Sequence, residues 1–391
     1  CIRDSSSTVN QWVTVTPKTA PTDASIVFDA DVLVVGYATL GAWLPLLKEV
    51  ARAVVYDESQ YIKNPQAKRT KAAIKLSKSL GPDGVVLNLT GTPVASRPAE
   101  YAAQLMALGK IQEFGGEWAF YKRYCGLFRD QWGQWHKDGH SNMEELNEKL
   151  RSMCYVRRLK HDVLPELGER RSVPLYVDAD PKVMAEYDKA ERDIATFMAN
   201  RAAEIAKELG KDPRSAAVMA RIKAESAEHL VRMSVLRQIA AKAKLPAVEE
   251  LVNGHIEEGS KVVLAAHHRD IVLGLSDKFG GYHIIGGQKV EDVERLKERF
   301  QNRPASDVPV MVLSIQAAKT GHTLTAAQDI VMVELPWTPA DFDQTVDRLH
   351  RIGQEGSVLA TSPLVPHTID EDMWELLAEK RQVVDAVTDG T

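Results

Sequence analysis

Two arginines near the C-terminus have the type and spacing that phosphoryl-transfer chemistry needs. Arg348 and Arg351 lie in the string QTVDRLHRIGQ, residues 344–354. Residues three apart share one face of a helical turn, and a guanidinium is always charged and binds phosphate oxygens through two hydrogen bonds. The pair therefore predicts a grip on a transferring γ-phosphoryl group. Taken without its context, an R-x-x-R string is more commonly a solvated basic helix end.

A pair of adjacent carboxylates, Asp57 and Glu58, directly follows a hydrophobic run. A carboxylate at the C-terminal end of a strand lies where parallel α/β sheets bind ligands. Nucleotide hydrolysis needs one carboxylate to hold Mg²⁺ and another to orient and deprotonate the attacking water. We assign these roles to Asp57, as the metal-holding residue, and to Glu58. Alone, the pair also fits a polar turn after a strand.

Short apolar runs that alternate with helical patterns must position these residues. The runs at 31–35, 53–56 and 85–89 indicate buried parallel strands. The patterns at 39–50 and 68–80 indicate helices between them. Alternation of this kind predicts a parallel sheet covered by helices.

Strand signals nearly vanish in the middle of the chain, where long helical patterns at 181–210 and 215–243 dominate. Further strands are predicted at 261–265, 282–285, 310–313 and 330–333, and helices at 291–300, 341–351 and 369–387. The predicted fold class is α/β, with two parallel-sheet lobes and a helical insertion and linker region between them. The predicted divisions are 1–110, 111–245 and 246–391, and the polar residues 1–30 are predicted to be weakly structured.

The composition is that of an ordinary globular protein, with 391 residues, 44% hydrophobic and 26% charged residues and a net charge of −5. The length suffices for two or three domains. The net charge gives no indication of nucleic acid, so a DNA site must be a local patch. No apolar run approaches the roughly 18 residues of a membrane helix, which predicts no membrane partner. Three widely spaced cysteines form no metal-ligand pattern and predict a cytoplasmic, or in a eukaryote nuclear, protein.

Five strings resemble, in the same order along the chain, the motifs of the Swi/Snf-type ATPases, which are DNA translocases of helicase superfamily 2. The strings at 57–65 (DESQYIKNP) and 89–94 (LTGTPV) resemble motifs II and III. The string at 261–271, with its HHRD block, resembles motif IV, and 313–327 resembles motif V. Residues 344–354 are similar to motif VI, the most recognisable of the family. The annealing-helicase-like branch fits best.

The resemblance implies two RecA-like lobes, ATP and Mg²⁺ as cofactors, and double-stranded or branched DNA as the partner. It makes Arg351 the arginine finger and Arg348 its partner on the phosphates or on motif II, with Gln344 positioning both. The residues implied to couple nucleotide and DNA are Gln60, where the family more often has His, and Thr90, Gly91, Thr92 and Gly321.

Two basic stretches are candidates for a surface that follows the DNA backbone, because phosphate contacts supply most of the affinity. Residues 63–78 contain five Lys, one Arg and no acidic residue, although a solvated helix face is an equal alternative. Residues 157–164 resemble the family's block between the lobes. Core packing is favoured over base stacking for Trp118, Trp132 and Trp135. The assigned DNA-binding residues are Lys63, Lys68, Arg69, Lys71, Arg157, Arg158, Lys160 and, in motif V, Lys319.

A phosphate loop, G-x-x-x-x-G-K-[ST], is expected but absent from the 391 residues. We therefore expect a truncated first lobe whose phosphate-loop segment is missing, and a DNA-dependent ATPase that is inactive alone. The leading function is an ATP-dependent double-stranded DNA translocase that remodels DNA or anneals strands. The alternative is a non-catalytic DNA-binding or regulatory module that has lost motif I. Because the chain starts at Cys1, a fragment, a split protein and a natural truncation all stay open.

Overall fold

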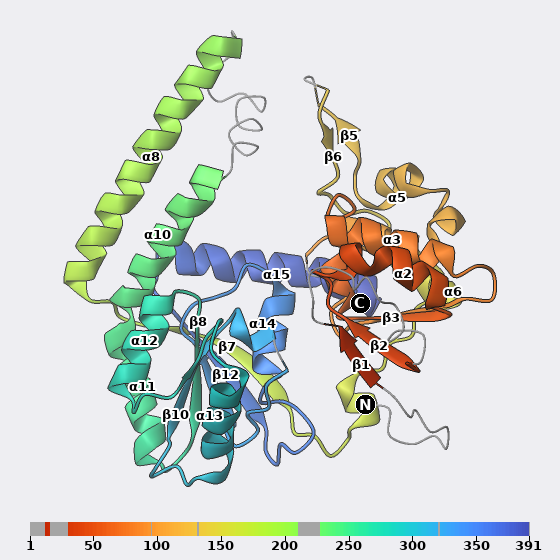
Figure 1. Ribbon diagram of the computed structural model, residues 1–391. Helices are drawn as coiled ribbons and strands as arrows, with labels where there is room; N and C mark the ends of the chain where they lie inside the picture. The colour runs from red at the N-terminus through yellow and green to blue at the C-terminus, as the bar shows by residue number, and fades with distance from the viewer. Residues whose placement is uncertain are drawn as a thin grey trace. The chain divides into compact units, whose positions relative to one another are not determined.

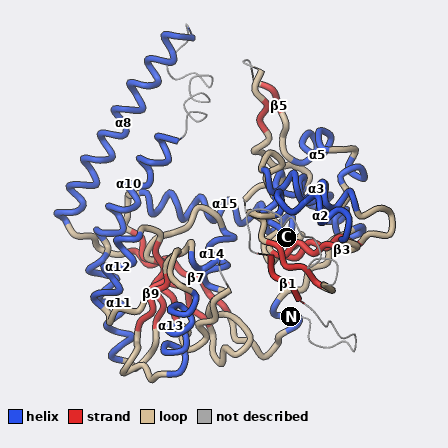
Figure 2. The backbone as a smooth tube through the Cα atoms, in the orientation of Figure 1, coloured by secondary structure: helices blue, strands red, loops and turns tan. Residues whose placement is uncertain are grey.

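The computed structural model of the chain consists of two compact units, which Figures 1 and 2 trace. Unit 1 comprises Cys1–Val156 and Arg381–Thr391, and unit 2 comprises Arg157–Lys380. The region 111–245, predicted as one helical part, is therefore shared between the units. The structure describes residues 12–15, 30–94, 96–130, 133–209, 227–319 and 321–390.

Parallel strand pairs form the α/β part of unit 1, as the apolar runs predicted. β1 pairs with β2, and β3 pairs with β4, all in parallel (Figure 1). β1 lies within the first 30 residues, so the prediction that these are weakly structured is wrong for this strand. The elements of this part are β1 (Trp12–Val15), β2 (Val32–Val35), α2 (Leu40–Val50), β3 (Ala53–Asp57), α3 (Lys68–Ser79) and β4 (Val85–Leu89).

The apolar faces of α2 and α3 pack together and fix the end of β3. Trp43 and Leu47 from α2 share one core with Ala73 and Leu76 from α3. Tyr56, the next-to-last residue of β3, is buried in this core, and its hydroxyl donates to the Ala73 carbonyl at 2.8 Å. The residues that follow Tyr56 are therefore held at a defined position.

A second core in unit 1 joins helices that follow β4 to the C-terminus of the chain. Phe114, Phe120 and Leu146 are buried there together with Val387, which lies near the end of the last helix. The elements around this core are α4 (Ala99–Ala107), α5 (Glu117–Tyr124), the antiparallel hairpin of β5 (Phe128–Arg129) and β6 (Trp135–His136), α6 (Met143–Met153) and the end of α15 (Ile369–Thr388).

Unit 2 is built on a six-stranded sheet in which every pairing is parallel. Its strand order is β7-β12-β11-β8-β10-β9. The four strands from β8 to β11 match the apolar runs predicted in this half of the chain, which confirms the α/β fold class. The strands are β7 (Arg170–Tyr176), β8 (Val262–Ala266), β9 (His283–Ile284), β10 (Val310–Ser314), β11 (Asp329–Met332) and β12 (Val358–Leu364).

The edge strand β7 lies in the region where strand signals were expected to vanish. Its sequence, RRSVPLY, has two charged residues and a proline, and most of its side chains are exposed. Proline cannot donate to a ladder and is tolerated at a sheet edge, where β7 pairs only with β12 among the described strands. An edge strand without an apolar run gives no periodic signal, which is why β7 was missed. The interior strand β12 was also missed.

Two long helices lie between β7 and β8 of unit 2 in sequence, in the region where helices were predicted. α8 covers Pro181–Leu209, and α10 covers Ala227–Ala243. The first part of the second predicted helix, 215–226, lies outside the described residues. No helix in the described part of the chain is both long and apolar enough to span a membrane.

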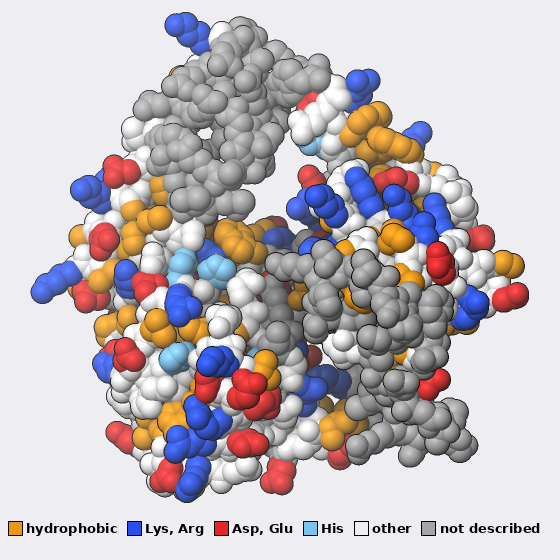
Figure 3. Space-filling model, in the orientation of Figure 1, with side chains coloured by type: hydrophobic (Ala, Val, Ile, Leu, Met, Phe, Trp, Pro, Cys, Tyr) orange, Lys and Arg blue, Asp and Glu red, His pale blue; other side chains and the backbone are white. Residues whose placement is uncertain are grey.

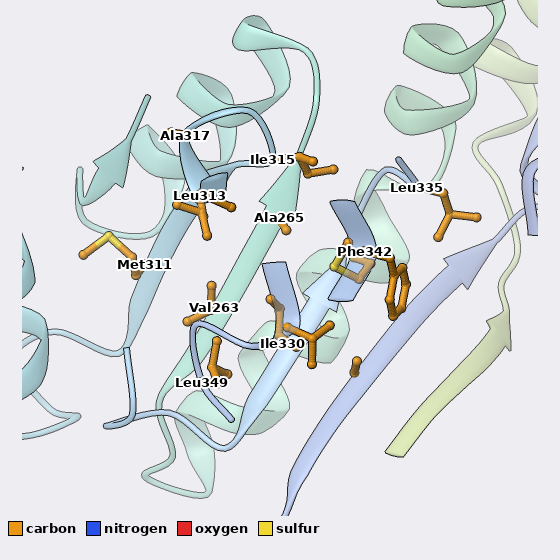
Figure 4. Close-up of a cluster of buried hydrophobic side chains, with 14 of the residues drawn as sticks. Val263, Ala265, Met311, Leu313, Ile315, Ala317, Ile330, Leu335, Phe342 and Leu349 are labelled. Atoms are coloured by element: carbon orange, nitrogen blue, oxygen red, sulfur yellow. The ribbon is translucent and has the colours of Figure 1, made fainter. Parts of the chain in front are cut away.

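The core of unit 2 holds the turn that carries both arginines. Figure 4 shows Phe342 and Leu349 among buried side chains from the central strands, such as Val263 and Ile330. Helix α14 ends at Val346, whereas the sequence predicted a helix to residue 351. The helices of this unit after α10 are α11 (Leu245–Glu257), α12 (Arg269–Lys278), α13 (Val290–Asn302), α14 (Pro339–Val346) and the first part of α15.

Candidate functional site

The two predicted carboxylates lie at the C-terminal end of β3. Asp57 is the last residue of the strand and is paired in register with Leu89 of β4, directly before Thr90. Its side chain is exposed. Glu58 has φ 50° and ψ 52°, a left-handed conformation that is uncommon outside glycine. The chain turns away from β3 at this residue. Because Asp57 and Leu89 are paired, motif II after β3 and motif III after β4 both begin at the same end of the strand pair.

A chain of hydrogen bonds connects motif II to motif III. The Gln60 amide donates to Glu58 Oε2 at 2.6 Å, and the Thr90 hydroxyl donates to Gln60 Oε1 at 2.6 Å. The Thr92 backbone amide in turn donates to Thr90 Oγ1 at 3.0 Å. Gly91 is the exposed residue of this turn. The structure thus brings the Glu58 carboxylate and the predicted coupling residues of motifs II and III together in one network.

Gln104 is a residue of this site that the sequence did not indicate. It lies on α4, is 3% exposed, and accepts a hydrogen bond from the Ser59 hydroxyl at 2.9 Å. Its amide donates to the Pro93 carbonyl at 2.6 Å. Because a buried amide needs partners, Gln104 fixes the two motifs to each other. The available signal was a glutamine among the apolar residues of the string AEYAAQLMA, after Glu100.

Tyr37 also contacts motif II, by donating from its hydroxyl to the Asp57 carbonyl at 2.8 Å. Burial, with the nearby Tyr56 and Asp57, raises the pKa of Tyr37 well above its ordinary value of 10.0. The phenol therefore stays protonated, and hence remains a donor, throughout the physiological range. Tyr37 lies just after β2, so this bond ties the ends of β2 and β3 together.

The two arginines are held in a tight turn after α14 and are not on one face of a helix, which corrects the sequence prediction. Arg348 is 9% exposed, and its Nε donates to the Gln344 carbonyl at 2.8 Å. Arg351 Nη1 donates to the His322 carbonyl at 3.1 Å. The Arg348 carbonyl accepts from the Leu324 amide at 2.8 Å. Motif VI is therefore bonded directly to the loop of motif V.

Gly321 belongs to this loop. A Cβ added to it would lie 3.9 Å from Arg348 Nη1, an ordinary van der Waals distance, and its φ is not in the left-handed region. Its place beside Arg348 is consistent with the coupling role predicted for it. Lys319, two residues earlier, closes a short 3-10 helix, Ala317–Lys319, and its side chain lies outside the described part of the structure.

The exposed face of α3 carries the basic stretch predicted to follow DNA. Lys68, Arg69 and Lys71 are exposed, while Ala73 and Leu76 face the core. Figure 3 shows lysine and arginine side chains gathered over this helix. This arrangement is a positive stripe on a helix whose opposite face is buried.

Two other DNA-binding candidates are paired within their own units. Lys63 Nζ lies 3.2 Å from Glu100 Oε1. Lys160 Nζ lies 2.8 Å from Asp347 Oδ1 and donates to the His350 carbonyl at 2.7 Å. These carboxylates offset the charge that a phosphate would otherwise meet. Of the linker residues, Arg158 is exposed, whereas Arg157 is only partly so.

Arg170 is a second residue that sequence analysis missed, and it joins the linker to motif VI. Its guanidinium donates to Asp343 Oδ1 at 2.5 Å and to Asp347 Oδ1 at 3.1 Å. Burial opposes the charge on Arg170, but Asp343 and Asp347 outweigh it and raise the pKa of the guanidinium. His350 Nε2 lies 2.7 Å from the Gly168 carbonyl. Motif VI is therefore bound to motif V on one side and to residues 160–170 on the other.

Stability of unit 2 is expected to fall as the pH is lowered through the histidine range. Burial lowers the pKa of His322, with help from Lys297 and Arg348, and burial lowers the pKa of His350 despite its bond to Gly168. Folding therefore favours the neutral form of both histidines. The stability that this adds to unit 2 is fully present above a pH of about 6.5, the pKa of an unfolded histidine, and is lost as the pH falls through the lower pKa of the folded state. Urea unfolding at about pH 7.5 and about pH 5.5 measures the loss. His322→Asn and His350→Asn should each reduce the change in unfolding free energy between these two pH values. An unchanged difference in both variants would contradict the prediction.

Family models match both parts of the chain. The SNF2-related domain matches residues 6–244, which is more than half of the chain, and the helicase conserved C-terminal domain matches residues 243–353. The two matches meet near the start of α11. They cover the residues of motifs II to VI described above.

Curated relatives show the same likeness. The chain is 31% identical over 340 residues to the SWI/SNF-related matrix-associated actin-dependent regulator of chromatin subfamily A-like protein 1 of Drosophila melanogaster, over 85% of this chain and 41% of that protein. It is 30% identical over 383 residues to the DNA annealing helicase and endonuclease ZRANB3 of Homo sapiens, over 94% of this chain and 33% of that protein. The chain therefore spans less than half the length of these relatives.

A solved structure, the Sulfolobus solfataricus SWI2/SNF2 ATPase core in complex with dsDNA, is 22% identical, with a TM-score of 0.42 over 97% of this chain and 77% of that chain. The family assignment rests on the domain matches and not on this similarity. Those matches span the same motifs that the sequence placed in order from II to VI. The chain belongs to the SNF2-related family, the Swi/Snf-type group of helicase superfamily 2.

Proposed function

We propose that the protein is part of an ATP-dependent motor that translocates on double-stranded DNA and remodels it or anneals its strands. The observation that carries this proposal is the hydrogen-bond chain from Glu58 through Gln60 to Thr90. A module that only binds DNA has no chemical need to orient a carboxylate in this way. The competing hypothesis of a non-catalytic regulatory module leaves this network without a purpose.

The residues present fit a magnesium nucleotide. Mg²⁺ prefers one or two carboxylates completed by water and phosphate oxygens, and Asp57 offers an exposed carboxylate at a strand end. Among the described residues, no group of three or more His, Cys, Asp or Glu side chains could hold a metal alone. Asp57 would therefore hold the ion together with water and the nucleotide. When bound, the ion would neutralise charge on the phosphates.

Within each unit, the chain's own groups have defined roles in this proposal. Glu58 accepts a proton from the attacking water, and Gln60 fixes the orientation of its carboxylate. Arg351 supplies positive charge to the phosphates, while the buried Arg348 and Gln344 shape the turn that presents it. The lysines of α3 contact the duplex backbone, and the loop of motif V holds the turn that carries Arg348 and Arg351.

These 391 residues contain no phosphate-loop string, so in this proposal the phosphate loop is supplied by a segment other than these residues. The exposed face of the β3–β4 pair supports this. Val55 is 54% exposed, and Val85, Leu87 and Leu89 are 51%, 49% and 49% exposed. Because alternate residues of a strand share a face, these side chains form one apolar surface. Parallel sheets are normally covered on both faces, so a further segment of the same lobe fits here.

Loss of the arginine finger should abolish hydrolysis. In the chain joined to a phosphate-loop segment, Arg351→Ala is expected to lower duplex-stimulated phosphate release by about 10³-fold or more. Duplex affinity should be unchanged, because α3 is untouched. Arg295→Ala, at an exposed arginine of α13 that pairs with Asp292 three residues earlier, is the matched control. Full activity in Arg351→Ala would overturn the assignment, and turnover by the 391 residues alone would show that other residues hold the phosphates.

A further inference from the structure

An exposed cluster of aromatic side chains lies on unit 1, away from the nucleotide site. Core packing was predicted for the tryptophans of this region, and the structure shows that this is wrong for two of them. Trp118 is 57% exposed and Trp135 is 48% exposed, and Phe128, on the other face of the hairpin that carries Trp135, is 58% exposed. Trp132 lies outside the described residues. Single exposed apolar residues are common, but contiguous ones mark binding surfaces.

The cluster is built from α5 and from both faces of the β5–β6 hairpin. Trp118 from α5 contacts Trp135 from β6, with ring centroids 5.2 Å apart at 62°. Phe128 and His136 are direct cross-strand partners and stack at 4.9 Å and 15°. Neighbouring strand residues point to opposite faces, so each face of the hairpin carries an aromatic surface. Figure 3 shows hydrophobic side chains gathered between this hairpin and α5.

The charge around the aromatic cluster is positive. The Arg129 guanidinium lies 5.8 Å from the Trp135 ring centroid and donates to the Gly133 carbonyl, and no carboxylate in the described part of the chain forms an ion pair with it. Lys122 of α5 is exposed nearby in sequence. The carboxylate of Asp130 is already used by the hairpin, where it contacts His136 Nε2 at 2.8 Å and accepts from the Gln134 amide at 2.9 Å. The available electrostatic partner for this surface is an anion.

We propose that this aromatic cluster binds unpaired bases of DNA by stacking. Flat rings next to positive charge are the combination that single-stranded nucleic acid recognises, because every base has a π face and every nucleotide a phosphate. An apolar protein partner would bury Arg129 without a carboxylate, which is unfavourable. The inference rests on the proposed function and deepens it, since it makes the substrate a duplex that contains an unpaired stretch.

Fluorescence anisotropy with two labelled DNAs tests this site in the 391-residue chain. One is a fully paired duplex, and the other is the same duplex with a short internal unpaired stretch. Trp118→Ala combined with Trp135→Ala is expected to weaken binding of the second DNA by about tenfold or more and to leave the first unchanged. Trp118→Phe should keep most of the affinity, whereas Trp118→Leu, which is apolar but not aromatic, should not. These side chains are exposed, so thermal unfolding should be unaltered.

The controls separate this inference from the motor proposal. Tyr176→Ala removes an equally exposed aromatic (59%) from β7 and should change neither affinity. Lys68→Ala with Lys71→Ala should weaken both DNAs alike. If the chain binds the paired duplex but the aromatic variants change nothing, the stacking site is refuted and the motor proposal stands. If Trp118→Leu matches Trp118→Phe, the surface binds an apolar protein partner. If neither DNA binds, both the stacking site and the DNA-binding part of the motor proposal are wrong for this chain.

Discussion

Replacing Glu58 with glutamine is expected to lower duplex-stimulated ATP hydrolysis by about 10²- to 10⁴-fold, the usual contribution of a positioned general base. The measurement is phosphate release by the chain joined to a phosphate-loop segment. Glutamine has nearly the same shape as glutamate, and its oxygen can still accept the Gln60 bond now measured at 2.6 Å. The variant therefore removes the ability to take a proton and little else.

Two further variants separate the chemistry from the structure around it. Glu49→Gln, at an exposed residue of α2, should hydrolyse ATP at the wild-type rate. Gln60→Leu should leave Glu58 present but unoriented, so we expect a loss that is smaller than that of Glu58→Gln. Wild-type turnover in Glu58→Gln would reduce Glu58 to a residue that only turns the chain after β3. Equal losses in all three variants would indicate a general defect in folding.

The parts of the fold that could be predicted from sequence are those with a strong period. The helix predicted at 68–80 is α3, which ends one residue earlier, and the strand predicted at 85–89 is β4. Both have apolar residues at regular spacing that a core requires. Strand β7 could not be found in this way, because its residues are polar or exposed and its role at the sheet edge depends on β12, which lies almost two hundred residues later.

The residue types of the candidate site could be read from the sequence, and their chemical roles stay predictions, whereas the contacts that support them could not be predicted. Asp57, Glu58 and Arg351 have types that identify them, whereas Gln104 acts through a buried bond to Ser59 that no local pattern encodes. Lys160 shows the opposite error. It lies in a basic string that suggests DNA, yet its charge is met by Asp347, 187 positions later. Sequence shows which charges exist, and only the fold shows which of them are already paired.

Replacing Arg170 with methionine is expected to destabilise unit 2 and to slow hydrolysis. The change removes the guanidinium that now contacts both Asp343 and Asp347, and leaves Lys160 as the cationic partner of Asp347. Breaking a fully buried pair costs about 3–5 kcal/mol. Because Arg170 is 24% exposed, we expect a smaller loss of unfolding free energy, roughly 2–3 kcal/mol. Urea unfolding measures it, and Arg171→Met, at the 73% exposed neighbour, is the matched control.

A second substitution decides whether this ion-pair network also positions the arginine finger. Arg170→Met combined with Asp343→Asn and Asp347→Asn removes these three charges together and leaves Lys160, a 41% exposed side chain that still donates to the His350 carbonyl. Replacing a network of buried charges in this way is often nearly neutral for stability. If the network positions motif VI, the triple variant should regain stability while its kcat stays low, because Arg351 is no longer held at both sides of its turn. If kcat recovers together with stability, the role of Arg170 is structural. The comparison is informative because residues 160–170, which lead into β7, and the loop at 321–324, which precedes β11, contact the same turn from two separate segments of unit 2.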